Sequence, residues 1–295
     1  MNICRFNDDR LGLVEGDQVF DVTEALSVIP AQRWPLKFGD PLIANLPAVR
    51  AEIARLRDGA TALPLTGVTL LSPVSWPTKV LAAPANYRKH VEQDTLDPGV
   101  DHGAHRDAVI NLDRPVDTYG LFLKAPSSVV GPADGVQLPF SDRRTDHEVE
   151  LAVIIGREAR HVRAADAHDY IAGYAIGLDI TVRGTEERSF RKSADSFSVL
   201  GPWLTTADMI PDAEDLQIAL SVNGIERQNS STGAMTVGIA ELIEIASRVY
   251  TLYPGDVLMT GTPEGVGAIV PGDLITARCS SIGSFEIAVR SGWPQ

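Results

Sequence analysis

The stretch His147-Glu-Val-Glu-Leu-Ala-Val-Ile-Ile155 decides most of what the sequence predicts about the fold. Its last five residues are apolar and mostly β-branched, which favours a buried β-strand. Residues two apart in a strand lie on the same face, so Glu148 and Glu150 point the same way and Val149 points to the opposite face. Two carboxylates are therefore expected side by side where this strand enters the core.

Similar short apolar segments, bounded by turn residues, occur along most of the chain. The expected strands span residues 79–83, 121–123, 151–155, 174–178, 218–222, 257–259 and 274–277. Pro254-Gly-Asp256 and Pro271-Gly-Asp273 each precede a strand, and Pro-Gly is typical of the centre of a type II turn. One clear helix is expected over residues 238–250, where five apolar residues recur at helical spacing. The pattern predicts a β-rich domain with few helices.

The beginning of the chain predicts a small separate module. Residues 12–22 contain two apolar stretches around a Glu-Gly-Asp turn, which is typical of a hairpin. Residues 47–57 are expected to form a helix, with Pro near its start and Gly after its end. A segment rich in Gly, Pro, Thr and Ser follows over residues 58–75. We therefore expect one domain over residues 1–70 and a larger one over residues 71–295.

Composition and charge limit the possible functions. The 295 residues are 44% apolar and 22% charged, which is usual for a folded protein. A net charge of −13 argues against a nucleic-acid partner or an anionic membrane surface, because both need a basic face. No apolar run approaches the roughly 20 residues that span a bilayer. Cys4 and Cys279 form no metal or redox motif, and with no N-terminal signal segment they predict a cytoplasmic protein.

Asp179 is a third notable carboxylate, at the end of the apolar stretch Gly173-Tyr-Ala-Ile-Gly-Leu-Asp179. A buried carboxylate without a partner is costly. One explanation is a salt bridge to Arg183, four residues on. The other is that Asp179 meets Glu148 and Glu150 around a cation. Three oxygen ligands without Cys or clustered His suit a hard ion such as Mg²⁺ or Mn²⁺, and the residues alone leave both explanations open.

Residues 88–118 form a long segment with few large apolar side chains. Loops longer than about 12–15 residues are usually functional lids or disordered. His90 lies near the start of this segment, and His102 and His105 within it are better explained as solvated loop residues than as a second metal site. The chain contains no Gly-x-Ser-x-Gly elbow, no phosphate-binding loop and no dinucleotide fingerprint.

An ordered series of motifs over roughly residues 76–290 resembles the fumarylacetoacetate hydrolase superfamily. The motifs are Asn86-Tyr-Arg-Lys-His90, Phe122-Leu-Lys-Ala-Pro-Ser-Ser128, His147-Glu-Val-Glu-Leu151, Gly173-Tyr-Ala-Ile-Gly-Leu-Asp179, Lys192-Ser-Ala-Asp-Ser-Phe197, Leu200-Gly-Pro202, Val222-Asn-Gly224, Pro254-Gly-Asp256 and Thr260-Gly-Thr-Pro263. Each motif alone is common, whereas the ordered set is specific. The resemblance implies an α+β, β-rich fold: a mixed β-sandwich roll of the superfamily's C-terminal domain type, after a small N-terminal α/β module.

The resemblance also implies an enzyme, usually a homodimer, with one Mg²⁺ or Mn²⁺ per subunit in the larger, catalytic domain. The implied site consists of the metal ligands Glu148, Glu150 and Asp179, the catalytic residues His90, Lys192 and Glu92, and the substrate-binding residues Arg183, Thr262, Lys124 and Tyr87. The implied substrate is a small 2-oxo acid.

The chain departs from the superfamily pattern at two positions. Many relatives carry a Glu three residues after the catalytic His, where this chain has Gln93. We therefore expect that Glu92 or Asp94 orients the imidazole of His90, or that no residue does. A Gln that relatives carry seven residues after the ligand aspartate is Glu186 in this chain.

The expected reaction is hydrolysis of a carbon–carbon bond in an acylpyruvate, a compound formed when aromatic rings are degraded. His90 would activate water, and Lys192 with the cation would stabilise the departing pyruvate enolate, where charge develops. The same site would suit a decarboxylase, an isomerase, or a lyase or hydrolase of sugar-derived keto acids. A metal-dependent binding protein without turnover is a further alternative, against which His90, Lys192 and Thr262 argue.

Overall fold

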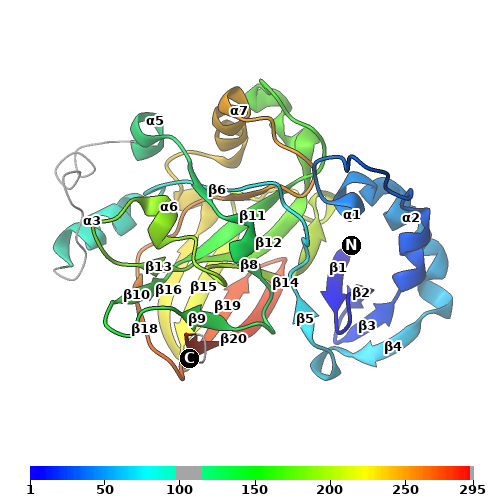
Figure 1. Cartoon of the computed structure of the whole chain (residues 1–295), viewed down its shortest axis with the longest axis horizontal. Helices are drawn as coiled ribbons and strands as arrows, with labels where there is room; N and C mark the ends of the chain where they lie inside the picture. Colours follow the sequence, from blue (N-terminus) through cyan, green and yellow to red (C-terminus); the bar gives the residue numbers. More distant parts are fainter. Residues whose placement is uncertain (98–113, 293–295) are drawn as a thin grey trace.

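The structure is a computed structural model that describes residues 1–97 and 114–292. Strands in three sheets dominate the described residues, which confirms the predicted α+β, β-rich fold. The twelve-stranded sheet runs across the molecule, with its N-terminal strands at one side (Figure 1). In spatial order its strands are β4 (Thr61–Pro64), β3 (Gln18–Asp21), β2 (Arg10–Glu15), β1 (Asn2–Phe6), β14 (Ser198–Thr206), β12 (Ile171–Asp179), β11 (Val149–Ile155), β17 (Val257–Met259), β6 (Val80–Ala82) and β7 (Phe122–Lys124), with β5 (Leu70–Leu71) beside β1 and β8 (Val129–Val130) beside β14.

Two smaller sheets and several helices complete the fold. The five-stranded sheet consists of β16 (Ile225–Ser231), β15 (Gln217–Val222), β19 (Leu274–Cys279), β20 (Gly283–Ser291) and β9 (Val136–Leu138), and the three-stranded sheet of β13 (Thr181–Val182), β10 (Thr145–His147) and β18 (Gly267–Ile269). The α-helices of the described residues are α1 (Pro41–Ala44), α2 (Leu46–Leu56), α3 (Arg88–Leu96), α5 (Pro115–Tyr119), α6 (Arg188–Arg191) and α7 (Ile239–Val249). Short 3₁₀ segments connect several of these elements. Among the described residues, no helix is long and apolar enough to cross a membrane.

Strand β11 is buried on both of its faces. Leu151 and Val153 enter the core that the large sheet shares with the five-stranded sheet, whereas Ala152 and Ile154 enter a second core that includes residues of α2. Side chains alternate between the faces of a strand, so the sequence of a strand that is covered on both sides is continuously apolar. This explains the uninterrupted stretch that follows Glu150.

The predicted strands and the two predicted helices are present. The hairpin is formed by β2 and β3, the helix near residue 50 is α2, and the helix near residue 245 is α7, whose apolar stripe is buried. Gly255 and Gly272 have φ angles of 86° and 99°, as the third position of a type II turn requires.

The prediction of a loop over residues 88–118 is wrong at both ends of the segment. Residues 88–96 form helix α3 and residues 115–119 form helix α5. His90 and Val116 are buried, so both ends of the segment pack against the protein. Helix α3 escaped prediction because it has no apolar stripe and contacts the protein largely through polar groups, described below. His102 and His105 lie outside the described residues.

The N-terminal strands continue the large sheet through β1, which pairs with β14 at Asn2↔Thr205 and Ile3↔Leu204. Phe20 and Leu11 of the hairpin belong to the same core as Ala152. The domain boundary near residue 70 stays a prediction.

Candidate metal centre and active site

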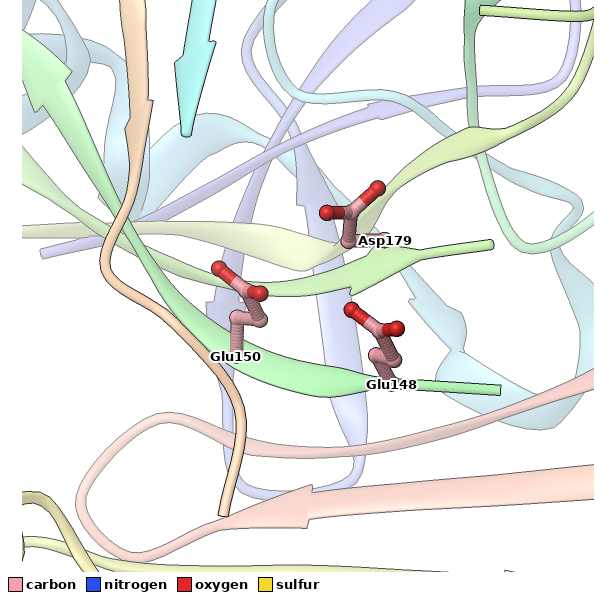
Figure 2. Close-up of side chains that lie close together, drawn as sticks. All are labelled: Glu148, Glu150 and Asp179. Carbon is pink, nitrogen blue, oxygen red and sulfur yellow. The ribbon is translucent and has the colours of Figure 1, made fainter. Parts of the chain in front are cut away.

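Three buried carboxylates meet where β11 and β12 run side by side. Cross-strand pairing joins Glu150 to Gly177 and Val149 to Leu178, and the amide of Asp179 donates to the carbonyl of Glu148 at 2.9 Å. Glu148 and Asp179 are thus opposite one another and point to the same face, which the two-residue period also gives to Glu150. Their carboxylates face a common space (Figure 2), with one oxygen of each residue within 4.8 Å of the others.

Two buried lysines neutralise part of this negative charge. The ammonium of Lys192 lies 2.8 Å from a carboxylate oxygen of Glu148 and 2.8 Å from one of Asp179. It also contacts the Thr181 hydroxyl at 2.6 Å. Lys124 donates to the other carboxylate oxygen of Asp179 and to the carbonyl of Phe197. Like-charge repulsion among the three carboxylates is therefore offset at Glu148 and Asp179.

Glu150 has no lysine partner of this kind. Among the described residues its carboxylate accepts one hydrogen bond, from the Gly261 amide at 2.7 Å. Burial, together with the charges of Asp179 and Glu148, raises the pKa of Glu150 well above its usual range. Lys192 and Arg183, by contrast, hold the pKa of Glu148 low despite its burial. A divalent cation would stabilise the Glu150 carboxylate, and an all-oxygen donor set suits Mg²⁺ or Mn²⁺.

Metal binding should release a proton. Because the raised pKa of Glu150 favours its protonated form in the metal-free protein and a ligand must be ionised, a metal has to displace that proton. Mn²⁺ affinity should therefore increase by up to about tenfold per pH unit as the pH approaches the raised pKa from below. Titration calorimetry in buffers of different ionisation enthalpy would count the protons released. Affinity that is flat with pH, with no proton release, would contradict a protonated Glu150.

The turn Thr260-Gly-Thr-Pro263 follows β17 and runs along the edge of β11. Thr260 N donates to the Leu151 carbonyl at 3.1 Å, and the hydroxyl of Thr262 donates to the Val149 carbonyl at 2.9 Å. The Gly261 amide between them reaches Glu150. The hydroxyl proton of Thr262 is thus used within the protein, and its role in substrate binding stays a prediction.

Gln228 on β16 is fully buried and holds this turn against β11. Its amide nitrogen donates to the Thr262 hydroxyl at 2.8 Å and to the Pro263 carbonyl at 2.9 Å. Its amide oxygen accepts from the Val149 amide at 3.0 Å and lies 3.1 Å from Nδ1 of His147. Sequence reasoning missed Gln228, because most of β16 is polar and exposed. The one available signal was its position in a hairpin strand that follows an Asn-Gly turn.

Gln228→Leu should lower the free energy of unfolding by about 3 kcal/mol, because it leaves buried groups on His147 and Val149 without their partner. Urea unfolding of the protein, freed of metal with a chelator, would measure the loss. Asn229→Leu is the matched control on the same strand, since Asn229 is exposed and, among the described residues, its side chain bonds only to Glu226. Equal effects of the two substitutions would show that the Gln228 contacts contribute little.

His90 lies near the three carboxylates on helix α3. It is 7% exposed, and its charge contributes to the low pKa of Glu148. Polar contacts hold the helix in place: Gln93 accepts from the Gly265 amide at 2.5 Å, and Asp97 pairs with Arg144 at 2.9 Å. The catalytic role of His90 stays a prediction.

The residues that flank Gln93 were expected to orient His90. Glu92 is exposed, and two residues along a helix turn a side chain about 200° away, so Glu92 faces away from His90. This geometry does not favour Glu92 as the partner of the imidazole. The side chain of Asp94 lies outside the described part of the chain. Gln93 contacts the Gly265–Val266 backbone. It therefore anchors helix α3 and does not serve as the acidic partner that many relatives carry at this position.

Arg183 and Tyr87 complete the set of predicted site residues. Arg183 does not form the alternative salt bridge to Asp179: its Nε lies 2.7 Å from Asp146, and its Nη2 lies 3.8 Å from Glu148. The hydroxyl of Tyr87 is buried without a hydrogen-bond partner among the described residues. Burial and the nearby charge of Glu150 raise the pKa of Tyr87, which keeps its hydroxyl a donor.

Comparisons with known proteins agree with the fold. The family described as fumarylacetoacetate (FAA) hydrolase C-terminal matches residues 79–290. The chain is 51% identical over 291 residues to maleylpyruvate hydrolase from Aquipseudomonas alcaligenes, covering 99% of this chain and 100% of the relative. It is 37% identical over 210 residues to a mitochondrial oxaloacetate tautomerase from Rattus norvegicus, covering 70% of this chain and 62% of that protein.

A solved structure extends the match to three dimensions. It is maleylpyruvate hydrolase from Sphingobium sp. SYK-6 in complex with manganese(II) and pyruvate, with a TM-score of 0.81 at 38% identity. The match covers 99% of this chain and 100% of that one. The expected sandwich of sheets is therefore confirmed at the level of the whole chain. With the family match over residues 79–290, these findings show that the chain belongs to the fumarylacetoacetate hydrolase family.

Proposed function

We propose that the protein is a divalent-metal-dependent hydrolase that cleaves a carbon–carbon bond in an acylpyruvate of the maleylpyruvate type and releases pyruvate. The observation that carries the proposal is the buried triad Glu148, Glu150 and Asp179 with Lys192 bridging two of its members. Full-length similarity to maleylpyruvate hydrolases supports the choice of substrate and a role in aromatic catabolism.

The triad would hold Mg²⁺ or Mn²⁺, which supplies Lewis-acid stabilisation of negative charge on the oxygens of a 2-oxo acid. Lys192 is placed to add an ammonium on the same side, since it contacts two of the three carboxylates. Its positive charge is secured there, because Asp179 and Glu148 raise its pKa in spite of its burial. Lys192 would therefore stabilise the enolate that the broken bond leaves behind.

His90 would take a proton from water as the water attacks the distal carbonyl. Attack and bond cleavage convert the acylpyruvate and water into a carboxylic acid and pyruvate. Tyr87 would donate its unused hydroxyl to a substrate oxygen, which would satisfy a buried polar group that has no protein partner among the described residues. Lys124 was expected to bind substrate. Two of the three donors of its ammonium are used by Asp179 and Phe197, so we assign it mainly to holding the triad.

Incubation of the Mn²⁺-loaded protein with maleylpyruvate should release one pyruvate per substrate, and a chelator should stop the release. Oxaloacetate belongs in the same assay, because the rat relative is an oxaloacetate tautomerase. Tautomerisation or decarboxylation of oxaloacetate without pyruvate release from any acylpyruvate would replace the hydrolase assignment with the alternative one. Binding without turnover of either substrate would favour a binding protein.

We further propose a cytoplasmic homodimer with one metal ion per subunit. Support for a reducing compartment comes from Cys4 and Cys279, which are both buried free thiols whose pKa burial raises to about 12. Sedimentation equilibrium would test the dimer, and metal analysis of protein purified without added metal would identify Mg²⁺ or Mn²⁺.

A further inference from the structure

Helix α6 places two arginines beside the candidate active site that the proposed mechanism does not use. They are Arg188 and Arg191, which immediately precede Lys192 in the chain. Neither has a carboxylate within 4.0 Å among the described residues, in contrast to Arg143 and Arg183, which pair with Glu186 and Asp146. Cationic groups that are not paired in the protein are available to an anionic ligand.

The ring of Phe122 connects Arg188 to the triad. The guanidinium carbon of Arg188 and the ammonium of Lys192 each lie 5.5 Å from the centroid of this ring. Phe122 and Lys124 are two apart on β7, so their side chains share a face, and Lys124 contacts Asp179. The ring of Phe122 therefore lies near both Arg188 and Lys192, and Lys192 contacts the candidate metal ligands Glu148 and Asp179.

Arg191 is held in a fixed position by the backbone. Its Nε donates to the Glu186 carbonyl at 2.8 Å, and its Nη1 lies 3.4 Å from the Val182 carbonyl. These contacts use carbonyl groups and leave its charge without a counterion. Burial, followed by the positive charges of Arg183 and Arg188, lowers its pKa, although the charges of Glu148 and Glu186 oppose this effect.

We propose that Arg188 and Arg191 form an anion subsite for a carboxylate at the end of the acyl tail of the substrate. The inference rests on the proposed function, because it assumes that the 2-oxo acid end lies at the triad. It assigns residues to the recognition of the second carboxylate of a maleylpyruvate-type substrate, which leaves with the dicarboxylic acid product. Arg188 and Arg191 bind and orient the tail, and neither takes part in bond cleavage.

A matched pair of substrates tests the subsite. Arg188→Gln and Arg191→Gln should each lower kcat/KM for maleylpyruvate by about 10- to 100-fold, as expected for one charge-assisted hydrogen bond, and mainly through KM. For an acylpyruvate of the same length that ends in a methyl group, kcat/KM should change by less than about twofold. Arg157→Gln is the control, since Arg157 also lies over an aromatic ring, that of Tyr170, outside the site. Equal losses on both substrates, or no loss on either, would overturn the subsite.

Ligand binding separates failure of the subsite from failure of the proposed function. Wild-type protein that hydrolyses neither acylpyruvate would refute the hydrolase assignment and leave the subsite to be decided by affinity. Mn²⁺-loaded wild type should then bind 2-oxoheptanedioate, which has the chain length of maleylpyruvate, at least about tenfold more tightly than 2-oxoheptanoate, which has a methyl group in place of the distal carboxylate. The Arg188→Gln, Arg191→Gln double variant should lose this preference. Because Arg191 supports the backbone, each variant needs an unchanged melting temperature, and if Arg191→Gln unfolds, Arg188→Gln alone decides.

Discussion

Asp179→Asn should abolish Mn²⁺ binding and reduce turnover to below about one-hundredth of wild type. In the chelated protein it should also lower the free energy of unfolding by about 3–5 kcal/mol, because it leaves buried positive charge without its partner. Lys124 donates to Asp179 from a fully buried position, and Lys192 lies 2.8 Å from its second oxygen. Circular dichroism with urea would give the stability, and calorimetry the metal affinity.

A double-mutant cycle isolates the contact responsible. Lys124→Met removes the second charge of the Lys124–Asp179 pair, so the double variant should recover much of the stability that Asp179→Asn loses, without recovering metal binding. Asp208→Asn is the surface control: Asp208 pairs with Arg50 in a half-exposed bridge, which should contribute no more than about 1 kcal/mol. Purely additive effects of the two buried substitutions would show that the pair is not coupled.

The chelated Asp179→Asn protein should respond to pH in a defined direction. Burial already lowers the pKa of Lys124, with Asp179 opposing this effect. Without Asp179, the pKa of Lys124 in the folded protein would fall further below its pKa in the unfolded chain. Stability of the variant should therefore rise with pH towards the usual lysine range, and the deficit relative to wild type should shrink.

Local periodicity made part of the site predictable from the sequence. Glu148 and Glu150 had to share a face once the extended pairing of residues 149–155 continued back to Glu148, and burial on both sides made that strand easy to recognise. The pairing of Glu148 with Asp179 is a matter of register between β11 and β12, which no local pattern sets. The motif resemblance supplied that link.

Contacts between distant polar residues were not predictable in this way. Lys124 is 55 positions from Asp179, and Gln228 is 79 positions from Val149. Their partners depend on how the sheets are stacked, which a residue's sequence neighbours do not encode. Helix α3 was missed for a related reason: Gln93 and Asp97 dock it through hydrogen bonds and an ion pair, so its sequence has no apolar period to detect.

His90 can be tested without disturbing the carboxylates. The imidazole is buried on α3, and it is not one of the three residues whose oxygens converge. Imidazole is the side chain best suited to proton transfer near neutral pH. A general base of this kind contributes typically about 10²–10⁴-fold to the rate.

His90→Ala should therefore lower kcat for maleylpyruvate hydrolysis by about 10²-fold or more, whereas Mn²⁺ affinity should stay within about twofold of wild type. Glu92→Gln is the matched control on the same helix, because Glu92 is exposed and turned away from the site, and its kcat should be nearly unchanged. Steady-state kinetics and calorimetry on both variants would measure the two quantities. Full activity of His90→Ala would refute the water-activating role of His90. A large loss of kcat in Glu92→Gln would instead show that Glu92 assists the imidazole, which the geometry of α3 does not favour.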